Sequence, residues 1–229
     1  MKIALFGVAA SAAALALAMP AAAAETLQVV SGNQFPRAVT VASADPIGQT
    51  FTAFTDTITS VGFEFTTLNN TANTPLTLSI FAGEALSGTS LFNASFVLPS
   101  ALTNRDQRVW VDIAVPSLAV TEGQLYSLVL NATSTRAALI TGPGFSPQQN
   151  RFYGDDAYAG GKLITNWTGI YQNCKGAANN CDANFRVTGD QIAAAVPESS
   201  TWALTILGFG VVGSALRGSR KTRANLTFA

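Results

Sequence analysis

Large hydrophobic residues in the middle of the chain recur at every second position, and few folds accommodate such a pattern. In the stretch 58–66, Val61, Phe63 and Phe65 alternate with glycine or polar residues. A period of two places successive side chains on opposite faces of a β-strand, whereas a helix requires a period of 3.6. The alternation recurs in four later stretches, whose inward residues are Leu76, Leu78, Ile80 and Ala82; Phe92, Ala94, Phe96 and Leu98; Val109, Val111, Ile113 and Val115; and Tyr126, Leu128 and Leu130. Each stretch is therefore predicted to be a half-buried strand.

Turn-forming residues separate the predicted strands at short intervals. They include Gly83, Gly88, the pair 122–123 and the asparagine-rich stretch 69–75. Such residues end strands, and no part of 25–195 has a sustained helical stripe. About 170 residues suffice for one hydrophobic core without a cofactor. We therefore expect a single all-β ectodomain over 25–190, folded as an antiparallel β-sandwich.

The stretch 142–184 has a different composition, rich in Gly, Asn, Gln and aromatic residues and poor in alternation. It is predicted to form long loops. Cys174 and Cys181 lie within it, and an oxidising compartment outside the cytoplasm favours a disulfide between them. A metal site is the alternative, but two thiols without histidine do not make up the usual zinc ligand set. We expect a disulfide that stiffens this region, with no metal and no other cofactor.

Composition argues against several classes of function. The chain has no histidine, which removes the commonest general base and the commonest metal ligand. No nucleophile elbow, P-loop or dinucleotide-binding glycine pattern occurs in a suitable context. Between 25 and 195, eight basic side chains stand against twelve acidic ones, so no surface for binding nucleic acid is indicated. The sequence thus favours a non-enzymatic protein without a nucleic-acid partner.

The N-terminus has the parts of a secretory signal peptide. Lys2 precedes an apolar run from Ile3 to Met19. Ala22 and Ala24 then stand in the A-x-A arrangement that a signal peptidase accepts, because its pocket admits only small side chains. We expect export through the Sec translocon and cleavage by signal peptidase at the end of a 1–24 signal peptide. An uncleaved membrane anchor is the alternative.

A second membrane element is indicated at the C-terminus. The uncharged stretch from Trp202 to Leu216 would span about 22 Å as a helix, less than the roughly 30 Å hydrocarbon core of a bilayer. Trp202 suits the membrane interface, and the basic cluster at 217–223 would stay on the cytoplasmic side. We expect a linker at 191–196, a short transmembrane helix over about 200–216 and a tail at 224–229.

This order of parts closely resembles the PEP-CTERM sorting signal of Gram-negative bacteria, in which a Pro-Glu-Pro motif precedes a short transmembrane helix and an arginine cluster. The resemblance covers 197–223. The matching residues are Pro197 and Glu198 in the motif, Trp202 and Ala203 at the start of the helix, and Arg217, Arg220, Lys221 and Arg223 in the cluster, while Ser199 stands where the family usually has proline. The resemblance implies an exosortase-type processing enzyme as a partner, and transient anchoring in the inner membrane before release to the cell surface. An ordinary, permanent tail anchor is the alternative.

Four short stretches of the middle resemble jelly-roll domains of bacterial surface proteins, which look similar to carbohydrate-binding modules. They are 48–51, 78–83, 120–126 and 185–187. The resemblance implies a jelly-roll-like sandwich. It supports the architecture better than any activity, because strand and turn residues are required by the fold whatever the ligand.

Two sets of residues have the chemistry of a glycan-binding surface, which uses flat aromatic rings for the sugar face and polar groups for the hydroxyls. The first set is Tyr153, Asp155, Asp156, Tyr158, Asn166, Trp167 and Tyr171, all in the predicted long loops. The second set is Trp110 with Arg108 and Asp112, on the face opposite Val109 and Val111. For each set a structural role is the alternative: aromatic residues that cap the sandwich, or a solvent-facing sheet with a cross-strand pair.

The loop carboxylates leave two further interpretations open. Asp155, Asp156 and residues 182–184 offer oxygens to calcium, but acidic turn residues explain these positions with less assumption. Glycoside hydrolysis would need two carboxylates facing each other across a cleft. Taken together, the sequence predicts an exported, exosortase-sorted, non-enzymatic surface or matrix protein that binds or organises exopolysaccharide. A secreted or periplasmic glycan-active hydrolase and a permanently membrane-anchored periplasmic sandwich are the alternatives.

Overall fold

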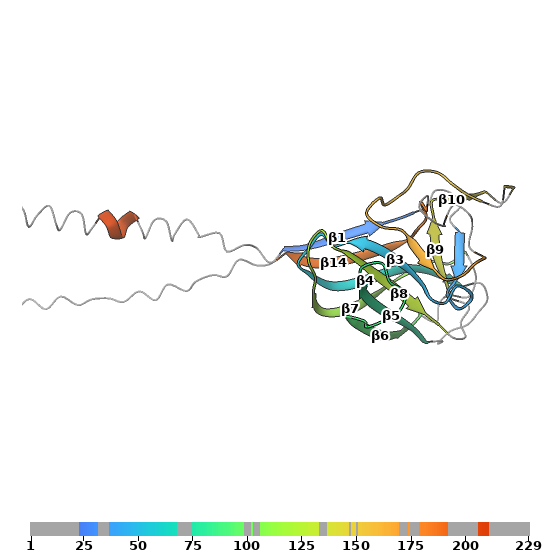
Figure 1. The fold of residues 1–229 in the computed structure, drawn as a ribbon, viewed down its shortest axis with the longest axis horizontal. Coiled ribbons are helices and arrows are strands. Elements are labelled where there is room, and N and C mark those ends of the chain that lie inside the picture. The colour runs from blue at the N-terminus through green and yellow to red at the C-terminus, as the bar shows by residue number, and fades with distance from the viewer. Residues whose placement is uncertain are drawn as a thin grey trace, which may run out of the picture. The chain divides into compact units, whose positions relative to one another are not determined.

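A computed structural model of the chain describes residues 23–31, 37–67, 75–98, 102, 106–132, 137–146, 148–149, 151–169, 174, 179–191 and 206–210. In this part of the chain the secondary structure is almost entirely β-strand, and two large antiparallel sheets dominate it (Figure 1). The predicted all-β class is therefore confirmed.

The first large sheet has seven strands with β4 at its centre. Its members are β1 (Ala23–Val29), β14 (Phe185–Gln191), β4 (Thr57–Thr67), β9 (Ala137–Gly142) and β13 (Asp182–Ala183) in that spatial order, with β2 (Arg37–Thr40) paired to β9 and β7 (Val109–Ala119) paired to β4. Strand β4 pairs with β7 along one edge, and with β14 and then β9 along the other. One sheet thus joins strands from the start, middle and end of the ectodomain.

The second large sheet has five strands. Their spatial order is β12 (Leu163–Thr165), β3 (Ile47–Thr52), β8 (Leu125–Asn131), β5 (Pro75–Ala82) and β6 (Phe92–Val97). Two smaller elements are a ribbon of β10 (Gly144–Ser146) with β11 (Arg151–Tyr153), and a 3-10 helix over Val41–Ser43. The two large sheets together form a β-sandwich-like fold.

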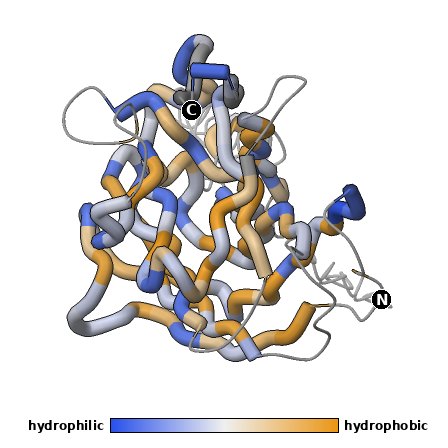
Figure 2. Tube along the Cα trace, turned by 90° about the vertical axis from the view of Figure 1, so that its right-hand side faces the viewer, coloured by the Kyte–Doolittle hydropathy of each residue, from blue (hydrophilic) through white to orange (hydrophobic). Residues whose placement is uncertain are grey.

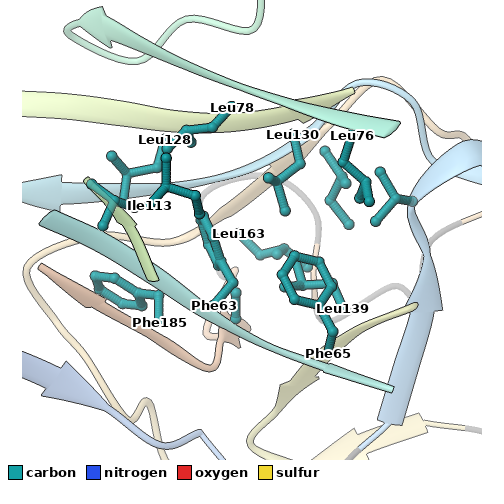
Figure 3. Close-up of a cluster of buried hydrophobic side chains, with 14 of the residues drawn as sticks. Phe63, Phe65, Leu76, Leu78, Ile113, Leu128, Leu130, Leu139, Leu163 and Phe185 are labelled. Carbon is teal, nitrogen blue, oxygen red and sulfur yellow. The ribbon is translucent and has the colours of Figure 1, made fainter. Parts of the chain in front are cut away.

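One hydrophobic core lies between the sheets, with side chains from both pointing toward one another (Figure 3). Phe63 and Phe65 of β4, Phe185 of β14, and Leu128 and Leu130 of β8 have no exposed surface. Except for Phe185, these are inward positions of the predicted alternating stretches, and Figure 2 shows hydrophobic and hydrophilic segments following one another along the strands. The alternation therefore predicted the core-facing side of these strands correctly.

The outer face of the five-stranded sheet is partly buried as well, which the alternation did not predict. Phe81 occupies a position predicted to face solvent, yet it packs with Val129 and Ile164 in a second buried cluster. Residues 85–86 cover this cluster, whereas Ala82, predicted to lie inside, is exposed. The prediction is wrong at this end of β5 because a loop folds back over the sheet and supplies apolar surface that no local pattern reveals.

The prediction of long loops over 142–184 is also wrong in part. The stretch contains β10, β11, β12 and β13, and these strands have two or three residues each. Strands this short cannot display a recognisable alternation. The turns predicted at Gly83, Gly88 and Gly123 are confirmed, since all three residues have a positive φ that glycine adopts without strain.

The start of β1 lies beside the end of β14, as Figure 1 shows. Ala23 pairs with Gln191, and Ala24 pairs with Asp190. Apart from Ala23 and Ala24, the predicted signal peptide lies outside the described residues, and of the predicted sorting signal only 206–210 is described, as helix. The predicted terminal site residues outside the described part are Ala22, Pro197, Glu198, Ser199, Trp202, Ala203, Arg217, Arg220, Lys221 and Arg223. No helix among the described residues is both long and apolar enough to cross a membrane.

Candidate functional site

An open groove lies along strand β12 at the edge of the five-stranded sheet. It has a volume of about 680 Å³ and is lined by residues 84–87 and 162–168 together with Cys174 and Asn179. We call it the Trp167 groove, after the predicted glycan-binding residue that it contains. Its volume lies within the roughly 300–1,000 Å³ that is typical of sites for small ligands.

Local contacts fix the indole of Trp167 in the groove. The Trp167 backbone N–H donates to Thr165 Oγ1 at 3.0 Å, and Thr165 Oγ1 donates in turn to the Ala44 carbonyl oxygen at 2.8 Å. Gly169 lies so close to the indole that a Cβ there would approach ring atoms to 2.7 Å. The Trp167 side chain is half-buried and packs partly against the core. The ring is thus held in place with part of its surface open to a ligand.

The predicted disulfide between Cys174 and Cys181 is confirmed, and its two Cα atoms are 5.1 Å apart. It lies beside β12, because the Leu163 N–H donates to the Cys181 carbonyl oxygen at 2.7 Å. Asn179 strengthens this contact: its Nδ2 donates to the Leu163 carbonyl oxygen at 2.7 Å, and its Oδ1 accepts from the Cys181 N–H at 3.0 Å. Residues 179–181, next to the disulfide, therefore cover the outer edge of β12 at Leu163 and support one wall of the groove.

Polar side chains share the groove with the indole. Lys162 Nζ and Glu84 Oε2 form an ion pair at 2.9 Å, and Asn166 and Ser87 are exposed. An aromatic ring can pack against the apolar face of a pyranose, while amide, hydroxyl and charged groups bond its hydroxyls. Lys162 and Glu84 are the charged residues of the described lining, and they neutralise each other. The groove therefore suits a neutral ligand rich in hydroxyl groups.

Other members of the first predicted set lie elsewhere. The Tyr158 hydroxyl accepts from the Thr52 N–H at 3.1 Å, and its ring meets that of Phe185 edge-on with 5.5 Å between centroids. Asp156 Oδ1 accepts from the Tyr158 N–H at 2.9 Å. These contacts match the structural alternative, in which the aromatic residue closes the sandwich and satisfies its polar atoms locally.

Asp182 has no exposed surface and is bonded on both carboxylate oxygens. Gln49 Nε2 donates to Oδ1 at 2.8 Å, and the Tyr158 N–H donates to Oδ2 at 3.1 Å. Gln49 is buried as well, and its Oε1 accepts from the Ala183 N–H at 2.8 Å. This network ties β3 to β13, and it corrects the expectation that Asp182 is a turn residue.

The pKa of Asp182 is raised from 3.8 to about 7. Burial is the main cause, because the charged form loses its hydration; the hydrogen bond from Gln49 opposes it, and the carboxyl group of Asp156 raises the pKa further. Burial also raises the pKa of Tyr158. Since Asp182 is enclosed, its carboxyl group takes part in this internal hydrogen-bond network and is not placed to touch a ligand.

The second predicted glycan set is covered by a residue that the sequence did not implicate. Arg186 of β14 reaches across β4 to bond both carboxylate oxygens of Asp112, and its guanidinium lies over the Trp110 ring, 4.8 Å from the centroid. Gly62 of β4 lies between them, where a Cβ would collide with Asp112 Oδ1 and lie 2.9 Å from Arg186 Cγ. The guanidinium covers one face of the Trp110 ring, and the Arg186–Asp112 pair crosses the sheet, so this set matches the structural alternative; Arg108 is exposed.

A second hollow of about 560 Å³ is lined by Leu27, Thr52, Ala53, Phe54, Glu122, Gly123 and Tyr158. Each of the two hollows described here has one carboxylate residue in its lining, Glu84 in the first and Glu122 in the second. Neither hollow therefore presents the paired acids that glycoside hydrolysis uses.

Within the described residues, no group of three or more His, Cys, Asp or Glu side chains could hold a metal ion.

The structure brings two members of the first set, Trp167 and Asn166, into the groove and separates them from the rest. Asp155 is exposed, Tyr153 lies in β11 opposite Gly144, and Tyr171 lies outside the described residues. Sequence reasoning missed the partners that complete the groove: Glu84, Ser87, Lys162, Thr165 and Asn179. Lys162 and Glu84 come from separate loops, so no local signal could have joined them.

No family model matches the chain, and a search of curated proteins finds none that matches it.

Proposed function

We propose that this chain is an exported, non-enzymatic surface or matrix protein whose jelly-roll-like sandwich binds polysaccharide in the Trp167 groove. The observation that carries the proposal is the placement of a braced indole beside exposed amide and hydroxyl groups in an open groove. An open groove can admit the interior of a long chain, whereas an enclosed cavity would admit only a chain end. The ligand class is a neutral, pyranose-containing polysaccharide, because the charges of the described lining cancel.

Export and sorting form the second part of the proposal, and the terminal segments support it. The signal-peptide pattern before Glu25 and the motif, helix and basic cluster of 197–223 imply Sec export followed by processing with an exosortase-type enzyme. The mature protein would then leave the inner membrane for the cell surface. Polysaccharide binding gives such a released protein a means of staying in the extracellular matrix.

The binding proposal is tested with the two tryptophans of the sandwich as a matched pair. Trp167→Ala removes the ring in the groove, and Trp110→Ala removes a ring already covered by Arg186. Binding to immobilised dextran, laminarin and galactomannan is measured, with alginate as the acidic comparison. We expect Trp167→Ala to weaken binding of at least one neutral polysaccharide about tenfold, and Trp110→Ala to leave it unchanged. Trp167→Phe should retain part of the affinity.

Folding is monitored for each variant by thermal unfolding, because Trp167 also contacts the core. Asn166→Ala alters an exposed side chain of the groove and keeps the test decisive if Trp167→Ala unfolds. Equal loss in the Trp167 and Trp110 variants, or a wild-type protein that binds none of the three neutral polysaccharides, contradicts the proposal.

A further inference from the structure

An ion pair joins the two chain segments that line the Trp167 groove. Glu84 follows strand β5, and Lys162 comes directly before β12, so the pair connects residues 84–87 with residues 162–168. Glu84 Oε2 and Lys162 Nζ are 2.9 Å apart, and their side chains are 48% and 33% exposed. A ligand in the groove can therefore reach both charged groups.

The backbone of Lys162 is fixed on strand β3. Its N–H donates to Thr50 Oγ1 at 2.8 Å, and its carbonyl oxygen accepts from the Thr50 N–H at 2.9 Å. Gly161 makes this close approach possible, because a Cβ there would collide with the Thr50 carbonyl oxygen. The position of Lys162 in the groove therefore depends on β3 and not on the ion pair.

The backbone on both sides of Glu84 is fixed on strand β8. The Ala85 N–H donates to Ser127 Oγ at 2.9 Å, and Ser127 Oγ donates in turn to the Gly83 carbonyl oxygen at 2.5 Å. The Gly83 N–H donates to the Leu125 carbonyl oxygen at 2.8 Å. Glu84 thus lies in a bend whose flanking residues are both bonded to the sheet.

The two anchoring residues, Thr50 and Ser127, belong to one cross-strand pair. They face each other in the register of β3 and β8, and both are buried. Directly opposed residues of an antiparallel pair project from the same face of a sheet. The backbone therefore holds Lys162 and Glu84 at neighbouring places on this face before a ligand arrives.

We infer that Glu84 gives the Trp167 groove its preference for uncharged sugars, because it holds the ammonium group of Lys162 in an ion pair. The carboxylate of a uronic acid unit would bond to an unpaired Lys162, since hydrogen bonds between an ammonium group and a carboxylate are strong. With Glu84 in place, the same carboxylate also meets a negative charge, and the two interactions oppose each other. Sugar hydroxyl groups are neutral and can bond to both side chains. Glu84 is thus the residue that selects among polysaccharides, provided that the groove binds them as proposed.

The test compares three glutamine variants of the protein purified from cells that express the full chain. Glu84→Gln and Lys162→Gln both remove the ion pair but leave opposite charges in the groove, and Glu122→Gln makes the same change of net charge in the second hollow. Binding is measured to alginate, which is a polyuronate, and to the neutral polysaccharide that the wild-type protein binds most tightly. We expect Glu84→Gln to bind alginate about fivefold more tightly than the wild type does, and to keep its affinity for the neutral polysaccharide within about twofold. Lys162→Gln and Glu122→Gln should gain no affinity for alginate.

Salt distinguishes an effect of charge from an effect of shape. The gain of Glu84→Gln should disappear at about 0.5 M NaCl, because dissolved ions screen exposed charges, whereas binding of the neutral polysaccharide should persist. A gain that persists at this salt concentration, or one that Lys162→Gln or Glu122→Gln shares, overturns the inference.

The wild-type protein separates failure of this inference from failure of the proposed function. If it binds a neutral polysaccharide and Glu84→Gln gains no affinity for alginate, the selecting role of Glu84 is overturned and the proposed function stands. Equal affinity of the wild type for alginate and for the neutral polysaccharide also overturns that role. A wild-type protein that binds none of the neutral polysaccharides overturns both.

Discussion

Asp182 is a carboxyl group that folding removes from water, so its titration is coupled to stability. Its pKa is about 7 in the folded protein against an ordinary 3.8, and between these values the folded state holds a proton that the unfolded state has released. The free energy of unfolding therefore falls as the pH rises from about 4 to 7, by up to about 1.4 kcal/mol per pH unit. Asp182→Asn should flatten this dependence, as measured by urea unfolding across the same pH range.

Two neighbouring acids, Asp156 and Asp155, give a second test of this pH dependence and a control for it. Asp156→Asn removes a carboxyl group that raises the pKa of Asp182, so the upper end of the pH window should move down. Asp155→Asn changes an exposed neighbour and should leave the window where it is. An Asp182→Asn protein with the same pH dependence as the wild type would show that the carboxyl group is not the source.

Variants at Gly62 and Asp112 distinguish the steric effect of an added methyl group from the loss of the Arg186–Asp112 ion pair. A methyl group in a strand would ordinarily stabilise it by about 0.5–1 kcal/mol, but here it would collide with the side chains of Asp112 and Arg186. We expect Gly62→Ala to lower the free energy of unfolding by about 1–2 kcal/mol, and Asp112→Ala, which removes only a partly exposed ion pair, by less than about 1 kcal/mol. Chemical unfolding of both variants checks this; the reverse order would contradict the steric explanation.

At the scale of elements, the disulfide and β12 act as one unit. Replacing Cys174 and Cys181 together by serine should lower the free energy of unfolding by at most about 2–3 kcal/mol, because the closed loop is short. It should also weaken polysaccharide binding, since β12 forms the wall of the groove. Thiol reduction of the wild-type protein should reproduce both effects and leave the double variant unchanged. Unchanged polysaccharide binding after reduction would show that the groove does not depend on the disulfide.

The features that could be predicted from the sequence are those that depend on residues close together in the chain. The alternation at Phe63 and Phe65 places each residue relative to its neighbours, so the strands and their core-facing side were predictable. The disulfide followed from the presence of two cysteines and an expected oxidising compartment. The groove was not predictable, because it depends on which loops meet in space. Gln49 and Asp182, 133 positions apart, show the same limit.

At the scale of the whole molecule, the predicted cleavage site after Ala24 lies beside the end of β14, because Ala24 pairs with Asp190. Cleavage after Ala24 would remove the first two residues of β1 and leave Glu25–Val29 paired with β14. The proposed cleavage after Ala24 would therefore leave Val29, the residue of β1 that is buried in the core, in place.

Intact-mass measurement of the protein from wild-type cells, and from cells lacking the processing enzyme, tests the proposed cleavage at both ends of the chain. We expect a polypeptide that starts at Glu25 and lacks the C-terminal cluster in the wild type, and one that keeps the cluster in the mutant strain. Replacing Arg217, Arg220, Lys221 and Arg223 by glutamine should also block processing. A wild-type polypeptide that keeps its whole C-terminal segment permanently would favour the alternative of a lasting membrane anchor.

Hydrogen–deuterium exchange with and without a neutral polysaccharide tests whether the ligand binds in the Trp167 groove, because it reports on the backbone amides of the whole molecule at once. We expect slower exchange in residues 84–87 and 162–168 when polysaccharide is bound, with no change around Trp110. Protection confined to other surfaces, or no protection at a saturating concentration of any neutral polysaccharide tested, would contradict it.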